Sequence, residues 1–305
     1  MTDPDLSITI GSLTLQNPVV TASGTFGYGL EFTPFLDINK LGAITVKGLS
    51  LQPRLGNPPP RIVETASGLL NAIGLENIGI EAFIREKLPL FKKIKAAIIV
   101  NILGNTLKEY EELTKRINEI EGVDALEVNI SCPNVKEGGI SFGGSSSSAY
   151  EVTSLIKKSS LLPIIVKLTP NNTDIVKIAK SVEEAGADGI SMVNTFLGMA
   201  IDIKKRRPIL ANITGGLSGP AIKPIALRMV WQTAQVVKIP IIGMGGIMSP
   251  PDALEFLIAG ASAVAIGTGN FINPCLSIEI VEGIKNYLIA NRMKDVKEII
   301  NSLET

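Results

Sequence analysis

The sequence predicts an α/β protein, a (β/α)8 TIM barrel with an N-terminal β-hairpin and long loops at the C-terminal ends of its strands. Eight short runs of apolar, β-rich residues recur along the 305 residues, and amphipathic helical patterns separate them. The runs are almost continuously apolar, which is typical of parallel strands covered on both faces. Composition does not shift along the chain, so residues 1–305 are expected to form a single domain. A doubly wound sheet is the competing architecture, but no G-x-G-x-x-G motif follows the first strand.

The elements follow in order along the chain. Residues 6–10 and 13–16 predict a hairpin around a tight Gly11-Ser12 turn. The eight barrel strands are predicted at 19–22, 43–47, 97–102, 125–130, 164–168, 189–194, 239–244 and 263–267. The helices are predicted at 106–120, 147–159, 172–186, 222–237, 251–259 and 276–291. In the third of these helices, Ile175, Ile178 and Val182 lie on one face, which is expected to cover the sheet.

Three stretches carry no periodic pattern, at 48–81, 131–146 and 195–219. Each is expected to be an irregular loop, and each follows the C-terminal end of a predicted strand. Long loops in compact domains usually carry function. Barrel enzymes place their chemistry at this end of the strands, so the site is expected there.

Composition excludes several classes of protein. Lys+Arg and Asp+Glu both total 29, so the net charge is zero and no nucleic-acid partner is expected. The chain has no histidine, which excludes Ser-His-Asp and Cys-His catalysis and histidine-bearing zinc sites. Its two cysteines cannot ligate an iron–sulfur cluster by themselves, so no metal site is predicted.

Cysteine usage and hydropathy also bear on location. Two cysteines do not form a secreted disulfide framework, which favours a reducing, cytoplasmic compartment. The first residues are polar and acidic, unlike a signal peptide. The segment 256–278 has no charged residue, but glycines and Pro274 interrupt it, so no membrane span is expected.

Two lysines end apolar strands, Lys47 and Lys167. Lysine is almost never buried without a partner, so two cations at one barrel mouth point to an anionic ligand or an electron-accepting ring. The alternative is that each side chain reaches solvent or pairs with a nearby carboxylate.

Glycines cluster after the last two strands, at 243–246 and 267–269, and again at 215–219. Exposed backbone N–H groups next to a helix start can hold a phosphate, and strands seven and eight are its usual place in this fold. The alternative is that tight barrel turns need glycine for conformational reasons alone.

Five asparagines follow strand ends, and an amide both donates and accepts, so such a set can bind a planar ring carrying C=O and N–H groups. They are Asn71, Asn101, Asn129, Asn134 and Asn194. Their alternative interpretation is as turn residues.

The thiol of Cys132 follows the fourth strand and is a candidate proton acceptor, provided that nearby cations lower its pKa. The competing interpretation of this cysteine is a small buried apolar residue. Cys275, which precedes the last helix, fits that second interpretation.

The motifs, taken in order, resemble those of the class 1 dihydroorotate dehydrogenases over nearly the whole chain. They are TASGTFG at 21–27, VKG at 46–48, NAIGLEN at 71–77, NISCPN at 129–134, GGLSGP at 215–220 and GMGG at 243–246. The resemblance implies a barrel that binds one non-covalent flavin mononucleotide (FMN) and oxidises dihydroorotate to orotate in pyrimidine biosynthesis.

The resemblance also implies a role for each matching residue. Cys132 is the base that removes the C5 proton while the C6 hydride passes to the flavin. The residues implied to bind substrate are Lys47, Asn71, Ala72, Ile73, Gly74, Leu75, Asn129, Asn134, Asn194 and Thr195. The residues implied to bind FMN are Ala22, Ser23, Lys47, Gly48, Asn101, Asn129, Lys167, Val193, Gly219, Gly245, Gly246, Gly267 and Thr268.

Two segments, 216–224 and 139–144, are more similar to the catalytic subunit of class 1B than to class 1A. Class 1B implies a homodimeric core within a heterotetramer, with partner subunits that carry FAD and a [2Fe–2S] cluster and pass electrons to NAD. The alternatives are a homodimeric class 1A enzyme that uses fumarate, a flavin barrel that reduces uracil-like bases, a phosphate-binding aldolase, and a non-redox barrel that binds a phosphorylated ligand.

Overall fold

The computed structural model describes residues 3–131 and 142–304. Its parallel strands close into a barrel in the order β10-β15-β16-β3-β4-β7-β8-β9, so neighbours in the barrel are also neighbours in the order of the barrel strands along the chain. The barrel strands are β3 (Val19–Thr21), β4 (Ala43–Leu49), β7 (Ala97–Ile102), β8 (Ala125–Asn129), β9 (Ile164–Lys167), β10 (Gly189–Met192), β15 (Ile241–Met244) and β16 (Ala263–Ile266). The predicted (β/α)8 barrel is confirmed, and the doubly wound sheet is excluded.

Six longer helices accompany the barrel strands, close to the predicted positions. They are α2 (Leu107–Asn118), α3 (Ser146–Ser159), α4 (Ile175–Glu184), α5 (Lys223–Ala234), α6 (Pro250–Ile258) and α8 (Leu276–Ala290). Helix α4 buries Ile175, Ile178 and Val182, as its spacing predicts. The Asp174 carboxylate accepts a hydrogen bond of 3.1 Å from the backbone N–H of Lys177, which caps the start of this helix.

The predicted hairpin is present and covers the end of the barrel opposite the predicted site. It consists of β1 (Ile8–Ile10) and β2 (Leu13–Leu15), joined through Gly11 at φ 58°. Ile8 and Ile10 are buried. A Cβ on Gly189, the first residue of β10, would lie only 2.7 Å from Ile10 Cγ2. The hairpin therefore packs against the N-terminal ends of the strands.

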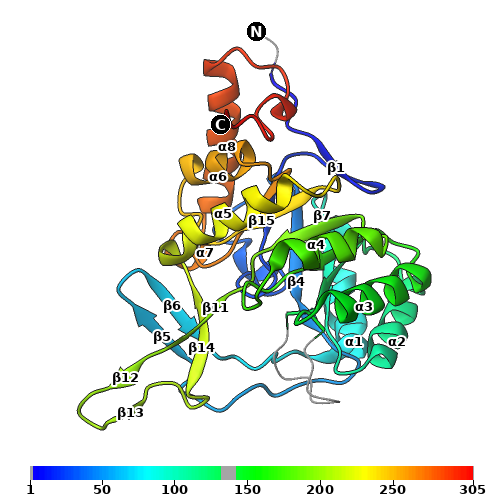
Figure 1. Cartoon of the computed structure of the whole chain (residues 1–305). Coiled ribbons are helices and arrows are strands. Elements are labelled where there is room, and N and C mark those ends of the chain that lie inside the picture. The colour runs from blue at the N-terminus through cyan, green and yellow to red at the C-terminus, as the bar shows by residue number, and fades with distance from the viewer. Residues whose placement is uncertain (1–2, 132–141, 305) are drawn as a thin grey trace.

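Two of the stretches expected to be irregular instead form an antiparallel sheet, so that prediction was wrong. The outer sheet has the order β11-β14-β6-β5. Its strands are β5 (Ile62–Thr65), β6 (Gly68–Asn71), β11 (Phe196–Met199) and β14 (Thr214–Ser218), and a small pair, β12 (Ile201–Asp202) and β13 (Arg207–Pro208), extends from it (Figure 1). These strands are only four or five residues long, and β6, β11 and β14 contain glycine, so they give little signal in the sequence. Their partners lie far away along the chain.

The remaining regular elements are short, and the sequence did not predict them. They are α1 (Gly79–Ala82), α7 (Gly269–Ile272), the π-helical turn η3 (Phe83–Lys87) and the 3₁₀ turns η1 (Leu30–Phe32), η2 (Ile38–Lys40), η4 (Leu88–Lys93), η5 (Pro220–Ile222) and η6 (Val296–Glu298). The third stretch expected to be irregular, 131–146, lies mostly outside the described residues. Among the described helices, none is long and apolar enough to cross a membrane.

Candidate active site

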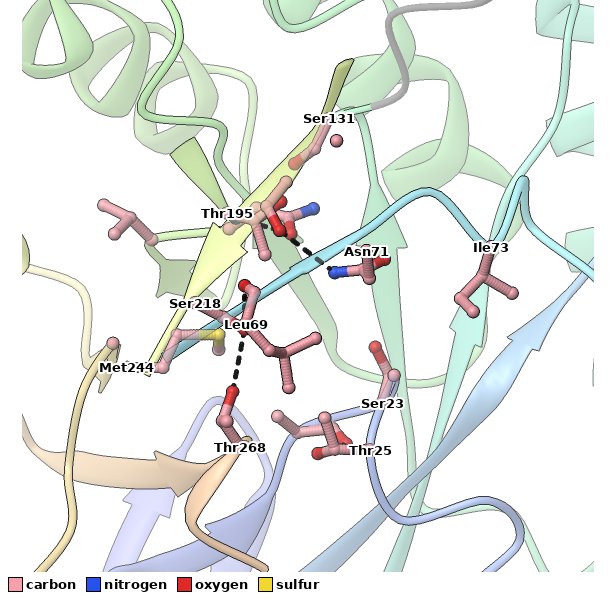
Figure 2. A pocket seen from close by; sticks show the side chains of 18 of the residues that line it. Ser23, Thr25, Leu69, Asn71, Ile73, Ser131, Thr195, Ser218, Met244 and Thr268 are labelled. Atoms are coloured by element: carbon pink, nitrogen blue, oxygen red, sulfur yellow. Dashed lines mark hydrogen bonds between the residues drawn. The ribbon is translucent and has the colours of Figure 1, made fainter. Parts of the chain in front are cut away.

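A cavity of about 780 Å³ opens at the C-terminal ends of the barrel strands. Every barrel strand supplies a lining residue at its end or just after it: Ser23, Lys47, Asn101, Asn129, Lys167, Val193, Gly245 and Gly267. The outer sheet supplies the opposite wall, including Leu69, Asn71 and Ser218 (Figure 2). The cavity is therefore enclosed between the barrel mouth and the outer sheet.

All the predicted site residues that the structure describes line this one cavity, although they come from segments far apart along the chain. This group includes both lysines, the glycines of the two last strand ends and the segment 71–75. Cys132 and Asn134 lie outside the described residues. Ser131, which precedes Cys132 in the sequence, and Gly144 both line the cavity.

Lys167 lies in a buried cluster of polar side chains at the base of the cavity. Its ammonium group is 3.3 Å from Glu127 Oε2 and donates to Ser23 Oγ at 3.2 Å. The carboxylate of Glu127 also accepts hydrogen bonds from the Asn101 amide and the Ser191 hydroxyl. Of the two alternatives to a ligand role, reaching solvent or pairing with a carboxylate, the structure shows the second.

Sequence reasoning missed Glu127 and Ser191. Only 3% of the surface of Glu127 is exposed, and it lies in the strand sequence ALEVN. Glutamate is almost never fully buried unless it is paired. A carboxylate inside an otherwise apolar strand was therefore the signal that could have identified Glu127.

Lys47 lies on β4, three strands away from the strand of Lys167 around the barrel. Burial lowers the pKa of its ammonium group below the ordinary value, because a charge is less stable away from water. The carboxylate of Glu76 partly offsets this effect, whereas the guanidinium of Arg61 adds to it. The charged form of Lys47 therefore gains from an anionic ligand.

The predicted asparagines differ in how their amides are occupied. Asn71 donates to the carbonyl oxygen of Gly216 at 3.3 Å, which joins β6 to β14. The Asn129 carboxamide oxygen accepts from the Ser131 backbone N–H at 3.1 Å. That of Asn194 accepts from the next backbone N–H at 2.8 Å. These bonds orient the amides and leave other donors and acceptors for a ligand.

The glycines after β15 have backbone conformations and neighbours that a side chain would disturb. Gly246 has φ 76°, and a Cβ there would lie 2.8 Å from the Lys223 backbone nitrogen and 2.9 Å from the Gly219 carbonyl oxygen. Nearby, Thr268 donates to Ser218 Oγ at 2.8 Å across the cavity wall (Figure 2). Gly245 and Gly246, here called the glycine corner, therefore present only backbone to the cavity.

Lys223, whose backbone lies next to Gly246, forms ion pairs with two carboxylates of α6. Lys223 Nζ lies 2.6 Å from Asp252 Oδ1 and 3.0 Å from Glu255 Oε1. The hydrogen bond with Asp252 raises the pKa of Lys223. Burial opposes ionisation of Asp252, but Lys223 and the Met248 backbone N–H hold the pKa of Asp252 below its ordinary value. The pair links the start of α5 to α6.

Cys275 lies outside the cavity. It is half-buried, which corrects the expectation of a buried residue, and its thiol donates to the Phe35 carbonyl oxygen at 3.2 Å. Its place just before α8 leaves part of its surface to solvent.

The barrel, the two lysines and the glycine corner together define an α/β-barrel enzyme whose cavity suits an anionic ligand with a polar ring. The chain belongs to the dihydroorotate dehydrogenase family, because the model of that family matches residues 5–288. The family resemblance seen in the motifs is thereby confirmed.

Curated relatives match the chain over its full length. One from Geotalea uraniireducens is 59% identical over 305 residues, covering 100% of both chains. Another, from Desulforamulus reducens, is 57% identical over 298 residues, covering 98% of both. Both are named dihydroorotate dehydrogenase B (NAD(+)), catalytic subunit.

A solved structure shares the fold. It is a DHODH from Eimeria tenella in complex with ferulenol, with a TM-score of 0.81 and 24% sequence identity. The match covers 98% of this chain and 89% of that one.

Proposed function

We propose that this chain is the catalytic subunit of an NAD-linked dihydroorotate dehydrogenase, which oxidises dihydroorotate to orotate in pyrimidine biosynthesis. One observation carries the proposal: a single cavity brings together both strand-end lysines, the asparagines and the glycine corner. Full-length identity of 59% to a relative with that name supports it.

The cavity residues fit FMN. The Asn101 Oδ1 atom is buried and has no hydrogen-bond partner among the described residues, so it is available to a donor on a ring. Gly245 and Gly246 line the cavity without side chains, at φ 128° and 76°, so their backbone can approach a phosphate closely. Lys167 provides a cation at the base of the cavity. FMN, when bound, supplies the two-electron acceptor of the reaction.

The residues of the chain bind the substrate and move its proton. Lys47 holds the carboxylate of dihydroorotate, while the amides of Asn71, Asn129 and Asn194 orient its ring. The thiolate of Cys132 accepts the C5 proton, as the family resemblance implies. The C6 hydrogen leaves with its electron pair, which balances the oxidation to orotate.

The electrons leave through a partner subunit. The chain has two cysteines, too few to ligate an iron–sulfur cluster. We therefore assign FAD and the [2Fe–2S] cluster to the partner, which passes electrons to NAD. The assembly is a homodimeric core of this chain within a heterotetramer. All 305 residues belong to one domain, and the enzyme works in the cytoplasm.

The chain purified without its partner provides the test. It should bind one FMN, and dihydroorotate should reduce that FMN, while NAD should receive no electrons. Sustained turnover with fumarate would instead identify the class 1A alternative. A protein that binds other phosphorylated ligands but cannot take up FMN would contradict the proposal.

A further inference from the structure

Four polar side chains form one layer inside the barrel, here called the polar layer: Asn101, Glu127, Lys167 and Ser191. The strand register places Asn101 opposite Glu127 across β7 and β8. It places Lys167 opposite Ser191 across β9 and β10. Across β8 and β9, Glu127 is opposite Ile165, and Lys167 lies two residues further along β9, on the same side of the sheet. All four side chains therefore point into the barrel.

Glu127 is the centre of the polar layer. Its Oε1 accepts from Ser191 Oγ at 2.7 Å. Its Oε2 accepts from the Asn101 amide nitrogen and lies 3.3 Å from Lys167 Nζ. Asn101 and Lys167 line the cavity, whereas Glu127 lies behind them and does not. Glu127 can therefore reach a ligand only through its neighbours.

The carboxylate of Glu127 determines how the side chains of Asn101 and Lys167 are oriented. An ionised carboxylate only accepts hydrogen bonds, so Asn101 must turn its NH₂ group toward Glu127. That orientation leaves Asn101 Oδ1 unpaired among the described residues, and a Cβ on neighbouring Gly48 would lie 2.7 Å from it. Lys167, only 5% exposed, lies between Glu127 and the Ser23 hydroxyl.

We infer that Glu127 is a positioning residue that fixes the Asn101 amide and compensates the charge of Lys167, thereby restraining the electron affinity of the flavin. The inference rests on the proposed FMN site. An uncompensated lysine beside the ring would stabilise the reduced, more negative flavin and make it a stronger oxidant. A buried carboxylate at 3.3 Å offsets that stabilisation. A low flavin potential suits delivery of electrons toward NAD.

The two-electron midpoint potential of FMN bound to the purified chain tests the inference. Glu127→Gln keeps the shape of the side chain and removes its charge. We expect the variant to favour reduced over oxidised FMN about tenfold more than the parent, a rise of about 30 mV for a two-electron couple. The matched control, Glu184→Gln on the exposed face of α4, should leave the potential unchanged. An unchanged potential in Glu127→Gln overturns the inference.

A double variant tests whether the rise comes from the uncompensated charge of Lys167. Glu127→Gln combined with Lys167→Met removes both charges of the pair, so its midpoint potential should lie close to that of the parent. If the potential of the double variant stays about 30 mV above that of the parent, the rise does not come from Lys167 and the inference fails. The double variant also carries the test if the single variant does not fold, since it leaves no unpaired buried charge. A parent chain that binds no FMN would overturn both this inference and the proposed function.

Discussion

Asn71 donates a hydrogen bond of 3.3 Å to the carbonyl oxygen of Gly216, which lies 145 residues further along the chain. This bond crosses from β6 to β14 and joins two separate insertions of the barrel into one sheet. A Cβ on Gly216 would also lie 2.0 Å from Thr195 Oγ1. The outer sheet therefore packs closely over the barrel mouth and makes the cavity a two-sided site.

Replacing Gly246 by alanine should weaken both the fold and FMN binding. The residue has φ 76°, and the new Cβ would lie within 3 Å of two backbone atoms. We expect the free energy of unfolding to fall by about 1–3 kcal/mol and FMN affinity to fall with it. Gly267→Ala is the contrast for stability alone, because the nearest protein atom to its Cβ would lie at 3.7 Å. Urea unfolding and FMN titration of both variants check this, and parent-like values for Gly246→Ala would refute it.

Ligand binding should depend on pH through Lys47. Its folded pKa lies below the ordinary value of 10.5, so the ammonium loses its proton earlier on the alkaline side than an exposed lysine. Orotate affinity should therefore decline as pH rises through that lowered pKa. In Lys47→Met, affinity should be weak at neutral pH and should lack this decline. Orotate titrations at several pH values test this. Identical pH profiles in parent and variant would show that Lys47 does not cause the pH dependence of orotate affinity.

The same pKa shift predicts a change in stability. Between the lowered pKa and 10.5, the unfolded chain binds more protons at this lysine than the folded chain does. Stability contributed by this group should therefore rise with pH across that window. Lys47→Met should lack the rise in urea unfolding series. A rise of equal size in the variant would assign it to other groups.

Asp252→Asn should destabilise the fold near the glycine corner. The carboxylate pairs with Lys223 at 2.6 Å and accepts from the Met248 backbone N–H at 2.9 Å. We expect a loss of about 1–3 kcal/mol in the free energy of unfolding at neutral pH. Because the folded pKa of Asp252 is lowered, the difference should persist above 3.8 and disappear as pH falls through the folded pKa. A pH-independent difference would point to lost packing instead.

The barrel could be predicted from sequence because its signals are local. Each strand is a nearly continuous apolar run, and helices such as α4 carry a regular apolar face and a capping residue. The outer sheet could not be predicted, since β14 has the sequence TGGLS and pairs with β6, which precedes it by well over 100 residues. Such pairing depends on the barrel bringing the two insertions together.

Some residues of the site could likewise be predicted from the sequence, and others could not. Lys47, Lys167 and the glycine corner were visible because charged or flexible residues interrupt apolar strands at their ends. Glu127 was overlooked because it lies two residues before the end of its strand. Its partner Ser191 is small and carries no signal of its own. Only the side-chain contacts show that Glu127 pairs with Lys167 and that Ser191 donates to Glu127.

The proton acceptor is tested by replacing Cys132. Without its thiolate, a positioned general base worth about 10² to 10⁴ in rate is lost. Cys132→Ala should slow flavin reduction by dihydroorotate within that range, while FMN content and orotate affinity stay near the parent values. Cys132→Ser should retain part of the rate with a higher pH optimum, because a hydroxyl is the weaker acid. Parent-like reduction in Cys132→Ala across the pH range would place the base elsewhere.

The central claim is that this barrel oxidises dihydroorotate through bound FMN. The most direct test is to mix the FMN-loaded chain with dihydroorotate under anaerobic conditions and to follow flavin absorbance together with the product. We expect full bleaching of the flavin and formation of one orotate per FMN, with no partner subunit present. A flavin that stays oxidised in the presence of saturating dihydroorotate would show that this barrel does not oxidise dihydroorotate.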